Sequence, residues 1–348
     1  MKNSLKLALI QTEIVFKDPD RNLNHIRTKV QESAARGARI ALLPEGCVDG
    51  YFIQDKADLT IMTPDDARLH NLATEGIAIF LPFAEHNPEM DHDVSAKPFS
   101  SVALIQSKNG ATSVEVVSRK ANLVDWSGRY VESKIFAHPT NPETGHKAQW
   151  ITEVDIDGVK IVAPICNDAF VPVAFAATLQ KFQPDMVLIP AASTVSKDTA
   201  GDQLADDGTI SFEEVWDLEL HSAAAYFQTV VAICNRPGSE QGQSFWGGSR
   251  VIGPLKDETN GHYYGDIMSD QPGTQIVDVP IDEVKTKLNN GRLDRQTVVS
   301  THAPTTRVVS VHRGETELTV MHHPSPRGPA TPTASPVVSA RRTGCGMV

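Results

Sequence analysis

The chain has 348 residues, four cysteines and a formal net charge of −11 at pH 7. With 40% hydrophobic and 22% charged residues, it has the composition of a globular protein long enough to bury a large core. The acidic balance argues against nucleic acid and anionic membranes as partners, and no stretch approaches the ~18 apolar residues of a membrane span.

Periodicity and capping residues predict alternating elements in the first half of the chain. Strands are expected at 5–10, 39–43, 77–84, 101–106 and 113–117. Helices are expected at 20–36, which Gly37 ends, and at 65–74. The Lys108-Asn109-Gly110 sequence between the last two strands is typical of a type I′ hairpin turn.

The second half continues the alternation. Strands are expected at 150–156, 159–163, 186–190, 229–234, 245–253 and 275–279. Helices are expected at 173–182, 212–227 and 281–288. Because Asp157-Gly158 and other turns join some strands as hairpins, mixed sheets covered by helices fit better than a purely parallel sheet.

The character of the chain changes near Arg295. Residues 301–348 are rich in Pro, Thr, Ser and Arg and have little periodicity, so they offer too few apolar groups to offset the entropy of ordering. We therefore expect one domain at 1–295 and a C-terminal extension at 296–348 that is largely extended or disordered.

The N-terminus and the cysteines bear on location. Residues 1–4 lead directly into the first strand without the apolar region or cleavage site of a secretory signal. Four cysteines in so long a chain indicate neither a disulfide framework nor a Cys-x-x-Cys zinc site. We expect reduced thiols and a cytoplasmic protein. The metal-like sequences Asp91-His92-Asp93 and His322-His323 fall in a polar loop and in the tail, and we expect no metal there.

Four side chains together form a chemically sensible set. Cys166 follows the buried strand at 159–163, where α/β enzymes place reacting atoms. Glu45 and Lys120 follow two other strands, and Glu132 lies in the loop beyond Lys120. A lysine can lower the pKa of a thiol and hold an oxyanion, while a carboxylate can take the thiol proton and later activate water. A single cysteine in this position is more often an unreactive core residue. The prediction of a catalytic site therefore depends on all four residues together.

Six short motifs occur in order across roughly residues 5–295. They are Leu42-Leu43-Pro44-Glu45, Arg119-Lys120-Ala121-Asn122-Leu123, Glu132-Ser133-Lys134-Ile135-Phe136, Ile165-Cys166-Asn167-Asp168, Asn235-Arg236-Pro237-Gly238 and Phe245-Trp246-Gly247-Gly248-Ser249. In this order they resemble the nitrilase superfamily of carbon–nitrogen hydrolases. The resemblance implies a four-layer αββα sandwich with two mixed sheets and a homodimer, or higher homo-oligomer, that associates helix face to helix face.

The resemblance also implies the site. Glu45, Lys120 and Cys166 would form a catalytic triad supported by Glu132, with no metal or organic cofactor. Glu45 would deprotonate Cys166, and Lys120 with a backbone N–H near Asn167 would stabilise the oxyanion. Ammonia or an amine would leave, and water would hydrolyse the thioester.

The branch of the superfamily is read from the residues around the nucleophile. Nitrile-cleaving members typically carry Cys-Trp-Glu there, whereas Cys166-Asn167-Asp168 resembles N-carbamoyl amidohydrolases and related amidases. Residues 169–173, Ala-Phe-Val-Pro-Val, lack the Arg that would hold an α-carboxylate, and residues 223–227 depart from the family's Arg-Ala-x-Glu-Asn.

We therefore expect a hydrolase of a linear amide or an N-carbamoyl (ureido) group. The alternatives are an acyltransferase on the same scaffold, a nitrilase proper, and a non-catalytic binding protein that keeps the fold. Asn167 is expected to contact the substrate. Trp126, Tyr51 and Phe170 are candidates for an apolar substrate pocket, with ordinary packing as the alternative for each of these three.

Overall fold

A computed structural model describes residues 4–126, 130–140, 147–148, 150–195, 211–257 and 260–289. The extension expected at 296–348 lies outside these residues, so that prediction is untested. In the described part, no helix is both long enough and apolar enough to cross a membrane.

The first sheet is mixed and follows the order β18-β1-β2-β4-β5-β6-β9, with β3 paired to β4. Its strands are β1 (Leu5–Gln11), β2 (Ile40–Leu42), β3 (Ile61–Met62), β4 (Ala78–Glu85), β5 (Phe99–Lys108), β6 (Ala111–Arg119), β9 (Trp150–Ile151) and β18 (Gly273–Val279). The strands β1, β2 and β4 are parallel, and the hairpin β5–β6 extends them in the antiparallel sense.

The second sheet follows the order β10-β11-β12-β13-β16-β17. Its strands are β10 (Val154–Ile156), β11 (Val159–Val162), β12 (Met186–Ala191), β13 (Val230–Asn235), β16 (Arg250–Asp257) and β17 (Gly261–Tyr263). Here β11, β12 and β13 are parallel. Two small ribbons pair β7 (Asp125–Trp126) with β8 (Tyr130–Val131) and β14 (Ser239–Glu240) with β15 (Gln243–Ser244).

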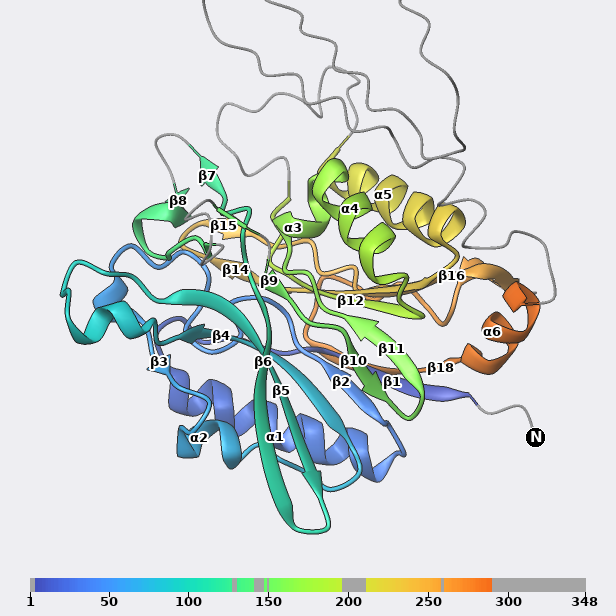
Figure 1. The fold of residues 1–348 in the computed structure, drawn as a ribbon, viewed down its shortest axis with the longest axis horizontal. Coiled ribbons are helices and arrows are strands. Elements are labelled where there is room, and N and C mark those ends of the chain that lie inside the picture. The colour runs from blue at the N-terminus through green and yellow to red at the C-terminus, as the bar shows by residue number, and fades with distance from the viewer. Residues whose placement is uncertain are drawn as a thin grey trace, which may run out of the picture. The chain divides into compact units, whose positions relative to one another are not determined.

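Helices cover the outer face of each sheet (Figure 1). The helices α1 (Pro19–Ala35) and α2 (Ala67–His70) lie against the first sheet, and α4 (Pro172–Phe182) and α5 (Phe212–Phe227) against the second. The remaining helical segments are α3 (Asn167–Phe170), α6 (Ile281–Asn289), η1 (Lys56–Asp58), η2 (Pro88–Asp91) and η3 (Glu132–Lys134). The layer order is therefore helix, sheet, sheet, helix, and the predicted four-layer αββα sandwich is confirmed.

Strand alternation divides the core into layers. In β1, Leu7 and Leu9 belong to the cluster that fills the space between the sheets, whereas Ala8 and Ile10 pack with α1. A period of two places successive side chains on opposite faces, so a strand buried on both faces is apolar throughout. In residues 5–10 only Lys6 interrupts this apolar character, and the strand predicted there from alternation is confirmed.

Local signals set several boundaries as predicted. Asn109 and Gly110 both have positive φ, 53° and 77°, as a type I′ turn requires. The helix α5 begins at a capping box in which the Ser211 hydroxyl accepts from the Glu214 N–H and the Glu214 carboxylate accepts from the Ser211 N–H.

Three predicted elements differ from the structure. The helix expected at 65–74 is only α2, because Asn71, Thr74 and Gly76 are weak helix formers. The strand expected at 150–156 divides into β9 and β10, which pair in different sheets. The strand expected from residue 245 begins at Arg250, because Gly247 and Gly248 adopt positive φ values of 60° and 62° that an extended strand does not contain.

Candidate active site

The four predicted catalytic residues extend from strand ends and the loops that follow them. Glu45 follows β2 and Lys120 follows β6 in the first sheet, while Cys166 follows β11 in the second. The N–H of Glu45 donates to the Ala191 carbonyl at 3.2 Å, and the N–H of Cys166 donates to the Pro190 carbonyl at 2.9 Å. Both acceptors lie at the end of β12. This strand therefore fixes the backbone positions of Glu45 and Cys166 relative to each other.

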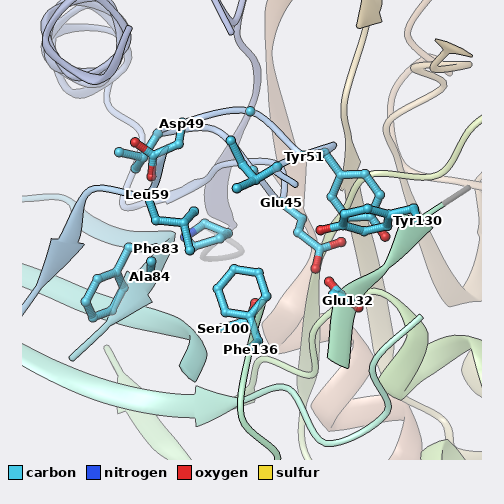
Figure 2. A pocket seen from close by; sticks show the side chains of 15 residues that line it. Glu45, Asp49, Tyr51, Leu59, Phe83, Ala84, Ser100, Tyr130, Glu132 and Phe136 are labelled. Carbon is cyan, nitrogen blue, oxygen red and sulfur yellow. The ribbon is translucent and has the colours of Figure 1, made fainter. Parts of the chain in front are cut away.

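Lys120 is fully buried and lies between two carboxylates. Its Nζ donates to Glu45 Oε1 at 2.7 Å and to Glu132 Oε1 at 2.8 Å. Burial alone lowers the pKa of Lys120, but Glu132 and Glu45 raise it well above its ordinary value. Burial also raises the pKa of Glu132 to about 7, against the attraction of Lys120. The result is a desolvated cation held in one position (Figure 2 shows Glu45 and Glu132).

Cys166 has a strained backbone at the start of α3. Its φ of 43° and ψ of −105° are unusual for a residue with a side chain, and such strain costs roughly 1–3 kcal/mol. The surrounding hydrogen bonds impose this conformation, since the Cys166 carbonyl also accepts from the N–H groups of Ala169 and Phe170 at 2.9 and 3.1 Å. The sharp turn fixes where the sulfur lies.

Asp168 joins the cysteine turn to the lysine segment, a role that sequence reasoning missed. Its buried carboxylate accepts from the N–H of Ala121 at 3.2 Å, the N–H of Asn122 at 2.8 Å and Asn122 Nδ2 at 2.9 Å. Asn167 Nδ2 in turn donates to the Asn122 carbonyl at 3.1 Å. A carboxylate two residues after Cys166 was the available signal, but its partners are 46 and 47 residues away in the sequence.

The surroundings of Cys166 favour the protonated thiol over the thiolate. Burial and the Glu45 carboxylate raise the pKa of Cys166 well above its ordinary value, although Lys120 acts in the opposite direction. We expected Lys120 to lower this pKa. It does act in that direction, but burial and Glu45 have the larger effect. Among the described residues, no hydrogen-bond donor reaches Glu45 Oε2. That oxygen can therefore accept a proton.

A cavity opens beside Cys166. It is lined by Tyr51, Val124, Cys166, Asn167, Phe170, Ala192, Ser193, Thr194, Phe212 and Trp216. The structure thus places Tyr51, Asn167 and Phe170, three of the predicted substrate-binding residues, on this cavity. The fourth, Trp126, ends β7, and its side chain lies outside the described part of the structure. We name this space the acyl cavity, after the acyl group that we propose it holds.

The aromatic wall of the acyl cavity was not predicted. The Phe170 ring lies 5.1 Å from Trp216 and 6.0 Å from Phe212, centroid to centroid. Trp216 Nε1 donates to Ser193 Oγ at 3.1 Å. The apolar face of α5 was the signal for Trp216, but such a face is more often ordinary core, and only the fold shows that it reaches the cavity.

A second buried ion pair fixes the backbone at Tyr51. Arg236 Nη2 lies 2.5 Å from Glu240 Oε2, and Glu240 Oε1 accepts from the N–H groups of Tyr51 and Phe52 at 2.9 and 2.6 Å. The Arg236 guanidinium stacks 4.5 Å from the centroid of Phe245. The motifs around 236 and 245 thus hold the loop that carries Glu45 and Tyr51, and Glu240 was missed.

The other titratable candidates stay apart from this site. Cys47 is buried in the core between the first sheet and its helices, consistent with the packing that we expected. In the described ranges, no group of three His, Cys, Asp or Glu side chains could hold a metal ion. Asp91-His92-Asp93 lies within those ranges, and His322-His323 lies outside them.

Comparisons with known structures give the fold. An amidase from Nesterenkonia sp. matches with a TM-score of 0.57 and 21% identity over 84% of this chain and 98% of its own. A mutant of that amidase in complex with butyramide matches with a TM-score of 0.56 and 21% identity, over 84% of this chain and 98% of its own. A glutamine-dependent NAD+ synthetase from Acinetobacter baumannii matches with a TM-score of 0.57 and 19% identity over 79% of this chain, which spans 45% of the synthetase.

Comparisons with known sequences give the family. No curated protein matches the chain. The sequence profile described as "Carbon-nitrogen hydrolase" matches residues 6–285, which is more than half of the chain and includes all four predicted catalytic residues. The chain therefore belongs to the carbon-nitrogen hydrolase family.

Proposed function

We propose that the protein hydrolyses the C–N bond of a linear amide or an N-carbamoyl group through a thioester on Cys166. The observation that carries the proposal is the fully buried Lys120, held at 2.7 and 2.8 Å by Glu45 and Glu132 near a strained cysteine. Burying a cation between two carboxylates costs free energy, so a purely structural role would favour apolar replacements.

The proposed acylation uses the groups that the geometry supplies. Glu45 Oε2 takes the Cys166 proton as the sulfur attacks the carbonyl carbon, so that no free thiolate is needed beforehand. Lys120 stabilises the oxyanion, together with the N–H of Asn167, which has no acceptor within α3 because it is the first helical residue. Glu45 then gives the proton to the nitrogen, the C–N bond breaks, and ammonia or an amine leaves.

Deacylation repeats these steps with water. Glu45 removes a proton from a water molecule that attacks the thioester carbon, and the proton returns to the sulfur as the acid leaves. Glu132 keeps Lys120 oriented, because its Oε1 accepts from Nζ and its Oε2 accepts from the Val124 N–H at 2.6 Å.

The acyl cavity favours an uncharged acyl group. Among the described residues that line it, none is charged, and Phe170, Phe212 and Trp216 form an apolar wall. The related amidase has been captured with butyramide, a short aliphatic amide, and with the acetamide moiety of fluoroacetamide covalently added at its active-site cysteine. By analogy, we propose neutral aliphatic or aromatic amides as the substrate class.

Ammonia release from a panel of compounds tests the proposal. The panel contains primary amides of increasing chain length, N-carbamoyl amines and nitriles, tested with wild type, Cys166→Ala and Cys234→Ala, the last changing another buried thiol. We expect release from uncharged primary amides or N-carbamoyl amines with wild type and Cys234→Ala, and none with Cys166→Ala. Activity that survives in Cys166→Ala contradicts the proposal, and turnover of nitriles alone moves the assignment to a nitrilase.

A further inference from the structure

The hairpin formed by β14 and β15 is fixed to the chain that continues β12. The Val195 N–H donates to the Ser244 carbonyl at 2.8 Å, and Thr194 forms a β-bridge with Phe245. The end of β12 also fixes the backbone of Cys166. The hairpin and the predicted nucleophile therefore share one support.

Glu240 of this hairpin reaches the loop that follows Glu45. Its Oε1 accepts from the N–H groups of Tyr51 and Phe52 at 2.9 and 2.6 Å. Gly50 makes this approach possible, because its φ is 106° and a Cβ there would lie 2.7 Å from Glu240 Oε2. Figure 2 shows Glu45 and Tyr51 extending from this loop. One buried carboxylate thus satisfies two consecutive N–H groups of the loop.

The loop itself is short and tightly closed. Residues 45–49 form consecutive turns, and the Gly50 N–H donates to the Gly46 carbonyl at 3.0 Å. A Cβ at Gly46 would lie 2.9 Å from the Gly50 carbonyl oxygen. Because so tight a turn does not absorb a displacement of Tyr51, the position of Tyr51 determines that of Glu45.

The stability of the fold does not account for the charges at this contact. Arg236 Nη2 lies 2.5 Å from Glu240 Oε2, and the two residues are 2% and 6% exposed. Among the described residues, Arg236 Nε and Nη1 have no acceptor. Burying two charges costs free energy that one contact repays incompletely, so apolar side chains of similar size would stabilise the fold at least as well.

We propose that Glu240 is a positioning residue for catalysis, which holds Glu45 at Lys120 by binding the N–H groups of Tyr51 and Phe52. Arg236 fixes the orientation of the Glu240 carboxylate, and Glu240 touches neither the substrate nor the reacting atoms. This inference rests on the proposed function and adds a residue to it. Its energetic basis is general, since a misplacement of about 1 Å can cost a reaction roughly 100-fold in rate.

Two matched double variants test the proposal, because each removes both buried charges. Arg236→Met/Glu240→Gln keeps a side-chain oxygen for the two N–H groups, whereas Arg236→Met/Glu240→Leu removes it. We expect kcat/KM for a primary amide to stay within about threefold of wild type in the Gln variant and to fall at least ~10-fold in the Leu variant. Circular dichroism and thermal unfolding establish that both variants are folded at the assay temperature.

Alkylation of Cys166 by iodoacetamide adds a readout that needs no turnover. Because the Glu45 carboxylate raises the pKa of Cys166, a displaced Glu45 should shift the midpoint of the alkylation rate to lower pH. We expect this shift in Arg236→Met/Glu240→Leu and a wild-type midpoint in Arg236→Met/Glu240→Gln.

The two readouts separate failure of this inference from failure of the proposed function. If the double variants have equal kcat/KM, whether retained or lost, the oxygen at residue 240 does not position Glu45 and the proposal is overturned. If wild type releases no ammonia from any amide, the proposed function is contradicted, and the alkylation midpoints decide the role of Glu240. Equal midpoints in the two double variants then overturn that role.

Discussion

At the scale of single residues, the site depends on where its protons lie. Lys120 is a buried cation between two glutamates, and Cys166 lies close enough for both kinds of charge to act on its pKa. The net effect raises the pKa of the thiol. In the proposed mechanism, nucleophilicity therefore comes from proton transfer to Glu45 during attack rather than from a thiolate that is already present. This differs from cysteine enzymes in which a nearby cation lowers the thiol pKa.

The first prediction concerns alkylation of Cys166 by iodoacetamide. Because burial and Glu45 raise the pKa of Cys166 above its ordinary value, the wild-type rate should still be rising with pH at pH 9. Glu45→Gln removes a negative neighbour, so the midpoint should move to lower pH while Lys120 remains. The rate is followed by intact mass. A wild-type rate that is already constant between pH 6 and 8 would show a thiolate and contradict this account.

At the scale of elements, Asp168 links the segment that carries Cys166 to the segment that carries Lys120. Its carboxylate receives three donors from Ala121 and Asn122, directly after Lys120, and it belongs to α3, directly after Cys166. The site geometry therefore depends on a carboxylate that touches neither the thiol nor the proposed substrate position.

The second prediction follows from this link. Asp168→Asn places a side-chain NH₂ group next to the N–H donors of Ala121 and Asn122. At least one buried hydrogen bond is then lost, and the free energy of unfolding should fall by about 1–3 kcal/mol. The kcat should fall more than KM rises, because the acyl cavity is unchanged. Urea unfolding and steady-state kinetics measure these effects, and Asp58→Asn serves as an exposed control. A variant with wild-type kcat would show that Asp168 does not position the site.

Elements that depend on local sequence signals were predicted better than those that depend on long-range pairing. The apolar alternation of β1 and the capping box of α5 are local, so 5–10 and 212–227 were predicted well. The division of residues 150–156 between two sheets was not predicted, because the local sequence does not show which strand each segment pairs with. In the site, the positions of Glu45 and Cys166 at strand ends could be predicted from the sequence. Glu240 and Trp216 could not, because long-range packing brings them to the site.

At the scale of the whole molecule, the outer face of the second helical layer is unusually apolar. Val173 of α4 and Leu218 and Tyr226 of α5 are 82%, 58% and 76% exposed. Leu218 and Tyr226 are exposed on α5, whereas Trp216 of the same helix is buried and lines the acyl cavity. We propose that this apolar surface mediates the homodimer that the family resemblance implies.

The third prediction tests that surface. Tyr226→Asp should convert a homodimer into a monomer, because the interface would bury the charged aspartate against apolar groups of the second subunit. Light scattering after size exclusion gives the mass, and Val94→Asp, at another exposed apolar residue that is 92% accessible, is the control. If wild type is monomeric, or if Tyr226→Asp keeps the wild-type mass, the surface is not the dimer interface.

If Cys166 carries the acyl group as proposed, intact mass after an acid quench detects it. Wild type, Cys166→Ala and Cys234→Ala are mixed with a short-chain primary amide and quenched within milliseconds. We expect an added acyl group on wild type and on Cys234→Ala, located by peptide mapping at Cys166, and no addition to Cys166→Ala. An adduct on any other residue, or ammonia release by wild type without a Cys166 adduct at any quench time, would contradict it.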